Sequence, residues 1–124
     1  MTSLDTITFF PLVPLAPVVN DWNISIFSIK SSSINVSWTL YVPDNPYSVH
    51  LYAVVCTPIN HDAGPIVATT SETETQLEVL RLRALTEYSV QVLALIGHTD
   101  SGALSFKGSQ KITVSTIEGG KYWS

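Results

Sequence analysis

Side chains capable of chemistry are few and scattered in this chain of 124 residues. His98, Asp100 and Ser101 lie within one short segment, and their residue types are those of a hydrolytic triad. A triad also needs a base that a third group holds in orientation and an oxyanion hole, which three neighbours on one loop do not provide. The polarity of a surface loop explains these residues better, and we predict no catalytic residue in the chain.

Metal-binding and nucleotide-binding patterns are missing from the sequence as well. His50 and His61 are not spaced as a ligand pair, either with each other or with a cysteine. The sequence contains no phosphate-binding loop, dinucleotide fingerprint, nucleophile elbow or H-E-x-x-H pattern. We therefore predict that the protein has no metal site and no cofactor.

The single cysteine, Cys56, cannot form a disulfide within the chain. It ends the apolar run 51–56, and no neighbouring residue suggests that a thiolate would be stabilised there. We interpret Cys56 as a small buried hydrophobic residue rather than a reactive thiol. The fold must then be held together by packing alone.

The composition is that of an ordered, weakly charged single domain. Hydrophobic residues make up 45% and charged residues 13% of the chain, and its mean hydropathy is +0.26. This is the opposite of the low hydrophobicity and high net charge that are typical of disorder. Six basic and ten acidic residues give a net charge of −4, which argues against a nucleic-acid partner because such proteins need a concentrated basic patch.

An apolar, proline-rich segment, residues 1–16, opens the chain. Its most apolar part is shorter than the roughly 20 residues that a membrane-spanning helix needs. Pro11 and Pro14 also exclude a helix there, so we predict an extended segment with no direct insertion into a membrane. Both a linker from a preceding domain and an arm packed on the domain remain open.

The rest of the chain has the period-two pattern of β-strands. Ile34, Val36 and Trp38 alternate with polar residues, and segments rich in proline, glycine, asparagine and serine separate such runs. Only residues 78–87 have a composition that favours a helix, and we assign their first half to a strand and their second half to a corner. Several short strands without long helices predict an all-β sandwich, with Trp38 as a large anchor of its core.

At Trp38 and Tyr88 the sequence resembles a fibronectin type III domain. The segment 34–38 resembles the family's tryptophan-bearing second strand, and 82–90 (LRALTEYSV) resembles its Leu-x-Pro-x-Thr-x-Tyr-x-Val corner. Ala84 replaces the proline of that corner, and the next residue, a leucine, stands where the family usually has glycine or a small polar residue. The resemblance implies an immunoglobulin-like, seven-stranded β-sandwich over residues 17–117, followed by a flexible C-terminal tail, residues 118–124.

Core positions follow from the alternation and from the resemblance. Tyr88 is expected to point inward and to form a hydrogen bond from its hydroxyl to nearby backbone, with Leu82 filling the space beneath its ring. The predicted core consists of Trp38, Tyr52, Val54, Leu82, Tyr88, Val90 and Val92.

The same alternation predicts an apolar outer surface. If Tyr52 and Val54 face the core, their neighbours face outward, and the strands that carry them lie side by side in the family. An exposed apolar patch can mark a partner site. We name as a possible partner surface Leu51, Val55, Leu93, Leu95, His98 and Asp100. The alternative, which we favour because single exposed apolar residues are common, is that the tails or an adjacent domain cover the patch, with Phe9, Phe10 and Leu12 as candidates.

Two sequons, at Asn23 and Asn35, are possible glycosylation sites if the protein is secreted. Both asparagines are predicted to point away from the core because the residues beside them point inward. Asn45 precedes a proline and is not an acceptor.

The resemblance implies a non-catalytic protein-interaction and spacer module, flanked by further domains in a larger protein. The loops around 43–47 and 97–102 or a sheet face would bind a protein partner, and pairing at a strand edge is included. The host is expected to be a cell-surface receptor, an adhesion protein or a receptor phosphatase ectodomain, and hence extracellular. Two alternatives remain: an intracellular scaffold of chromatin-associated or muscle type, and an accessory domain of a larger enzyme.

Overall fold

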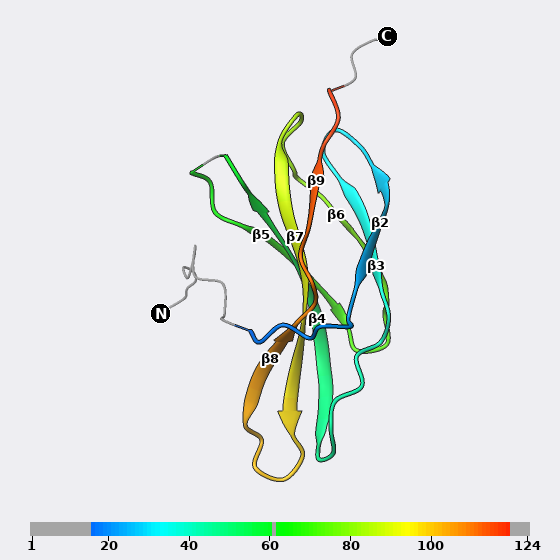
Figure 1. Ribbon diagram of the computed structural model, residues 1–124, viewed down its shortest axis with the longest axis vertical. Coiled ribbons are helices and arrows are strands. Elements are labelled where there is room, and N and C mark those ends of the chain that lie inside the picture. Colours follow the sequence, from blue (N-terminus) through cyan, green and yellow to red (C-terminus); the bar gives the residue numbers. More distant parts are fainter. Residues whose placement is uncertain (1–15, 61, 120–124) are drawn as a thin grey trace.

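The computed structural model describes residues 16–60 and 62–119, which form two antiparallel β-sheets (Figure 1). The smaller sheet has the order β2-β3-β6, and the larger has the order β5-β4-β7-β8, with β9 also pairing with β7. The strands are β2 (Ile24–Ile29), β3 (Ile34–Trp38), β4 (Tyr47–Pro58), β5 (Ile66–Ser71), β6 (Gln76–Val79), β7 (Glu87–His98), β8 (Leu104–Gly108) and β9 (Ile112–Ser115).

This is the predicted all-β sandwich. Residues 78–87, the one stretch of helix-favouring composition, contain no helix: Glu78 and Val79 end β6, residues 80–86 form an irregular corner, and Glu87 begins β7, so the strand part is shorter than expected. Within the described ranges there is no helix long and apolar enough to cross a membrane. Strands β8 and β9 pair with successive parts of β7, so they act as one interrupted edge strand, and on this count residues 16–60 and 62–119 form seven strands.

The interruption between β8 and β9 is built around Ser109, which is fully buried. Its hydroxyl accepts a hydrogen bond from the Val92 N–H at 2.9 Å and donates one to the Gln110 carbonyl at 2.9 Å. The side-chain amide of Gln91 donates to the Ser109 carbonyl at 3.0 Å. Because every polar group here has a partner, the break can be buried without the cost of an unsatisfied donor or acceptor.

The main core lies between the two sheets, and it contains all the residues that the sequence assigned to it. Each is at most 6% exposed. They are Trp38, Tyr52, Val54, Leu82, Tyr88, Val90 and Val92. Burying one such large apolar side chain stabilises the fold by about 1.5–3 kcal/mol.

The expected outer apolar patch is wrong in one respect: Val55 and Leu93 are not exposed. They do point away from the main core, but they are only 4% and 2% exposed, because a second cluster forms on that outer face. Ala16 and Phe106 pack against this cluster. The face is therefore largely consumed by packing within the chain and does not offer Val55 or Leu93 to a partner. Phe9, Phe10 and Leu12, the residues we favoured as its cover, lie outside the described residues.

Candidate functional site

The corner between β6 and β7 is pinned by Tyr88. The ring is buried, and its hydroxyl accepts a hydrogen bond from the Arg83 N–H at 2.8 Å. Leu85, at the tip of this corner, is 71% exposed and has a φ of 52°, in the left-handed region that favours glycine. The departure from the family motif at this position therefore has a backbone cost.

The segment that follows β9 is fastened to this same corner. Thr116 is buried, and its hydroxyl donates to the Arg83 carbonyl and accepts from the Thr86 N–H at 3.0 Å. The Ile117 N–H donates to the Lys30 carbonyl at 3.3 Å. Residues 115–117 thus have a fixed position between the corner and the turn that joins β2 to β3.

The loop 98–103 uses its polar side chains to hold its own shape. The Nδ1 atom of His98 accepts hydrogen bonds from the N–H groups of Asp100 at 3.2 Å and Ser101 at 3.1 Å. The hydroxyl of Ser101 accepts a bond from the Ala103 N–H at 3.2 Å. Gly102 has a φ of 77°, which completes the tight turn. The imidazole caps a turn, and its Nδ1 lone pair is already used, so the three residues have no triad geometry.

The two loops expected to bind partners lie side by side. The Thr99 N–H donates to the Pro46 carbonyl at 2.9 Å, and the rings of Tyr47 and His98 meet edge to face with centroids 5.1 Å apart. His50 lies against Gly97, where its ring occupies the space that a Cβ would fill. The loops around 43–47 and 97–102 therefore form one continuous surface at this end of the sandwich.

Of the six residues named as a partner surface, four retain exposed area. Leu51 and Leu95 are opposite one another on β4 and β7 and are half-buried. His98 is half-buried and Asp100 is exposed. These four lie toward the loop end of the larger sheet, whereas Val55 and Leu93 lie farther from the loops along β4 and β7.

Cys56 is fully buried, and burial raises the pKa of its thiol to about 12. The thiolate, which is the nucleophile and the metal-binding form, is then scarce at neutral pH. Among the described residues, no three histidine, cysteine, aspartate or glutamate side chains lie close enough to hold a metal ion. His61 lies outside the described residues.

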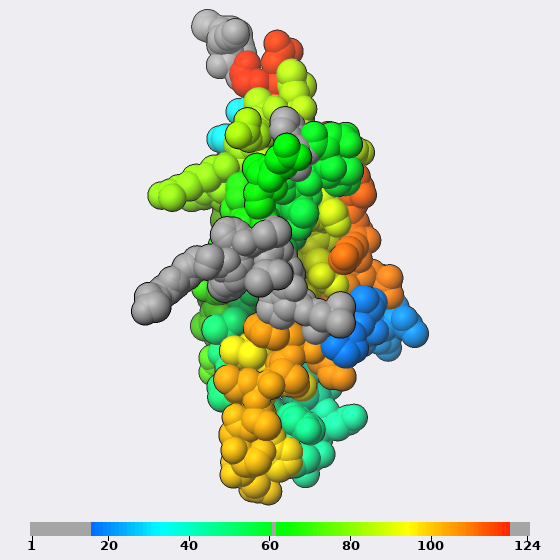
Figure 2. All heavy atoms as spheres, turned by 90° about the vertical axis from the view of Figure 1, so that its left-hand side faces the viewer, coloured from blue at the N-terminus to red at the C-terminus, as the bar shows by residue number. Residues whose placement is uncertain are grey.

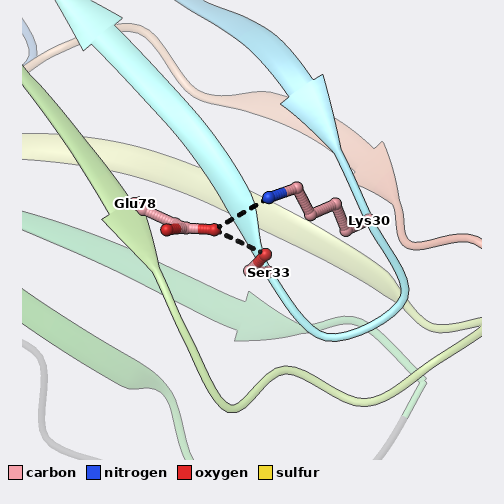
Figure 3. A network of polar contacts seen from close by, with 3 residues as sticks. All are labelled: Lys30, Ser33 and Glu78. Atoms are coloured by element: carbon pink, nitrogen blue, oxygen red, sulfur yellow. Dashed lines mark hydrogen bonds and ion pairs between the residues drawn. The ribbon is translucent and has the colours of Figure 1, made fainter.

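The two sequons lie on the smaller sheet or at its start. Asn23, immediately before β2, is exposed, whereas Asn35 on β3 is half-buried. Asn35 lies opposite Glu78 on β6, whose carboxylate accepts a hydrogen bond from Ser33 at 2.9 Å and pairs with Lys30 at 3.5 Å (Figure 3). This polar group belongs to the solvent-facing side of the sheet. Asn23 is thus the more accessible acceptor.

Trp22 is a core residue that we did not predict. Its ring is 3% exposed, lies 5.3 Å from that of Tyr41 and 6.0 Å from that of Tyr52, and its Nε1 donates to the Thr39 carbonyl at 3.0 Å. The signal was present in the sequence, because Trp22 has the same parity as the inward-facing Ile24. Burial raises the pKa of Tyr41, with a further contribution from a nearby aspartate, and burial also raises that of Tyr52.

Comparisons with known proteins agree with this architecture. The family model described as "Fibronectin type III domain" matches residues 16–110. Among solved structures, the fn3 domain of the human collagen alpha-1(XX) chain is 20% identical with a TM-score of 0.62, covering 85% of this chain and 92% of that one.

The FN5 domain of Drosophila Lar is 23% identical with a TM-score of 0.58, covering 85% of this chain and 100% of that one. The FN1–FN3 domains of chicken CNTN1 are 22% identical with a TM-score of 0.59, covering 84% of this chain and 31% of that one. A search of curated proteins gives no match. At these identities the solved structures bear on the fold alone.

Proposed function

The chain belongs to the fibronectin type III family, and we propose that it is a non-catalytic protein-interaction and spacer module of a larger protein displayed at the cell surface. Domains of this family are commonly interaction or spacer modules and are generally non-catalytic. The proposal fits how the polar side chains are used. Those of His98, Ser109 and Thr116 form hydrogen bonds that shape loops and strand ends.

A spacer must transmit position along the chain, and this chain is held to the sandwich by backbone hydrogen bonds near both its first and its last described residues. At the start, the Val19 N–H donates to the Gly108 carbonyl at 2.8 Å, and the Gly108 N–H donates to the Pro17 carbonyl at 2.9 Å. At the other end, Ile117 is bonded to Lys30. The flanking segments would therefore leave the sandwich from fixed positions.

The observation that carries the cell-surface part of the proposal is the exposed sequon at Asn23. A glycan needs an acceptor that is free of the packed core, and Asn23 meets this condition. Asn35 is half-buried but lies on the outer side of β3. We propose a receptor, an adhesion protein or a receptor phosphatase ectodomain as the host.

Expression of the chain through a eukaryotic secretory pathway, followed by intact-mass measurement, tests this placement. We expect added glycan mass that an N-glycosidase removes, and we expect Asn23→Gln to abolish most of it. Asn35→Gln should remove the remainder, whereas Asn45→Gln should change nothing, because Pro46 follows that asparagine. Secreted, folded protein without glycan would count against the cell-surface host and favour the intracellular scaffold.

The interaction role needs a separate experiment. Fluorescently labelled chain should bind intact cells in a saturable manner, and unlabelled chain should compete for the same sites. Loop variants such as Asp100→Asn would report whether the paired loops contribute. Binding that never saturates and is not competed would contradict an interaction role for this domain.

A further inference from the structure

An open sheet exposes unpaired backbone groups at its edges, and folded proteins usually protect these edges from other chains. Two sheets have four edges, and three of them here carry such protection. Strand β2 has a register shift at Phe27, strand β6 has only four residues, and strand β8 is partly covered by the bridge from Val18 to Gly108. Strand β5, at the fourth edge, has none of these devices.

Strand β5 is a regular edge. Its six residues, IVATTS, include no proline and no charge, and they pair with β4 without any shift of register. Among the described residues, β4 is the only strand with which β5 pairs. In an antiparallel pair, alternate residues direct their backbone groups to the partner, so roughly half of the amides of β5 point away from the sheet.

The edge is also accessible. Val67 is 53% exposed, and Thr69 and Ser71 on the same face are exposed as well. The end of β4 and the start of β5 extend away from the rest of the sandwich (Figure 1), and green atoms of this region lie at the surface (Figure 2). A second chain could therefore approach without displacing the smaller sheet.

Carboxylates stand at both ends of this edge. Asp62 precedes β5, and Glu72 and Glu74 follow it, with no lysine or arginine anywhere in the segment 59–75. The turn after β5 is ordered, since the Glu74 N–H donates to the Ser71 carbonyl at 3.2 Å. A strand of six residues is about 20 Å long; Asp62 lies four residues before its start, and Glu72 directly follows its end.

We propose that β5 is a docking edge for an extended segment of another protein, whose uncharged, β-branched core is flanked at each end by lysine or arginine. The core would add a strand beside β5 through backbone hydrogen bonds, and the basic flanks would meet Asp62 at one end and Glu72 and Glu74 at the other. This inference rests on the proposed interaction function and names the surface and the chemistry of the partner.

A second copy of this chain fits the edge less well. Antiparallel self-pairing about Ala68 keeps the inner and outer faces of the two strands in line, and it places Asp62 of one copy opposite Glu74 of the other. Both copies also carry a net charge of −4. Like charges placed directly opposite across a strand pair are destabilising, so the charges that attract a basic segment oppose a β5–β5 dimer.

Synthetic peptides test the proposal on the full chain. The probe has six alternating valine and threonine residues, matched to the length of β5, between paired lysines. The control peptide has the same core between paired glutamates. We expect saturable binding of the lysine peptide by fluorescence anisotropy, with chemical-shift changes centred on residues 66–71. Equal binding of the glutamate peptide, or shift changes elsewhere, would overturn the proposal.

Two proline variants separate loss of docking from loss of folding. The N–H groups of adjacent strand residues point to opposite sides, so Ala68→Pro and Thr69→Pro differ in which side loses its donor. One variant breaks a hydrogen bond to β4, and the other removes a donor from the free edge. The variant that keeps the wild-type circular dichroism should bind the lysine peptide at least about fivefold more weakly. Unchanged binding by that variant would exclude β5 as the edge.

Charge variants complete the test. Asp62→Asn and Glu72→Gln should each weaken binding of the lysine peptide roughly two- to fivefold, whereas Glu118→Gln, distant from β5 in the sequence, should not. Sedimentation over a range of concentrations tests whether a second copy of the chain occupies β5 instead. A dimer that Val67→Lys abolishes and Leu104→Lys does not would show that the edge binds a second copy rather than a foreign segment. Loss of peptide binding alone would leave saturable binding to cells, and hence the proposed function, intact.

Discussion

Exchanging Leu85 for glycine should show that the corner between β6 and β7 carries backbone strain. A non-glycine residue in the left-handed region pays a steric cost of about 1–2 kcal/mol, and Leu85 has a φ of 52°. Glycine removes this cost but is more flexible in the unfolded chain, which costs about 0.5–1 kcal/mol. The backbone effect should therefore favour glycine by roughly 0.5–1 kcal/mol.

Comparison of Leu85→Gly with Leu85→Ala isolates that effect, because both variants lose the same leucine contacts. The side chain is 71% exposed, so those contacts are few. Urea unfolding followed by the fluorescence of the buried Trp22 and Trp38 should show the glycine variant unfolding at about 0.5 M higher urea than the alanine variant. Gains relative to the wild type should be smaller, since the wild type keeps its leucine contacts.

The same pair of substitutions at Thr113 provides the control. This residue is exposed in the middle of β9, in ordinary extended backbone. Glycine there should be less stable than alanine by about 0.5–1 kcal/mol, so the sign of the difference should reverse between the two positions. A glycine variant at position 85 that is no more stable than the alanine variant would refute the idea of strain at the corner.

Three further predictions use the buried groups. Tyr88→Phe should destabilise the fold by about 1–2 kcal/mol in urea unfolding, because the Arg83 N–H loses its 2.8 Å acceptor. Trp22→Phe should lower the free energy of unfolding by about 1 kcal/mol more than Trp38→Phe does. The Nε1 of Trp22 is hydrogen-bonded, whereas that of Trp38 has no partner among the described residues. Equal losses of stability in urea unfolding would contradict this. Burial raises the Cys56 pKa from 9.0 to about 12, so above pH 9 the thiol ionises in the unfolded chain while it stays protonated in the folded one. The free energy of unfolding should therefore fall by about 1 kcal/mol between pH 8 and 10. Cys56→Ala, though less stable at pH 8, should lack this contribution, and equal slopes of unfolding free energy against pH for the two proteins would contradict it.

How far the sequence predicts this fold depends on whether a feature is local. The inward residues of β3 and β7 were predictable, since strand side chains alternate and one face must be buried. The corner at Tyr88 was predictable because its spacing along the chain matches a known motif. The burial of Val55 and Leu93 was not, because alternation says which side a residue faces but not what covers that side. Here Ala16 and Phe106, both distant in sequence, pack against that face.

The burial of polar residues could not be predicted from the sequence either. Gln91 and Ser109 look like surface residues in the sequence, yet each is at most 9% exposed. Their burial depends on hydrogen-bond partners that only the folded chain brings together, and these hydrogen bonds stabilise the break between β8 and β9. The candidate site likewise depends on contacts between distant parts of the chain. The meeting of the loops through Tyr47 and His98 follows from the length of β4 and β7, which pair along their whole extent.

The sequence of β5 deals with the risk that an exposed edge strand pairs with the wrong chain. A regular, uncharged edge offers backbone groups to any chain, and the usual remedy is a charge or proline within the strand. In this protein the charges lie just outside the strand, in Asp62, Glu72 and Glu74. Placed there, they leave the backbone groups of β5 free while penalising a second copy and any acidic segment. The charged ends of β5 would select the partner, and the backbone hydrogen bonds of its middle would hold it. Added salt should weaken the attraction between charges and leave the backbone hydrogen bonds largely unchanged, so the two contributions to binding can be separated experimentally.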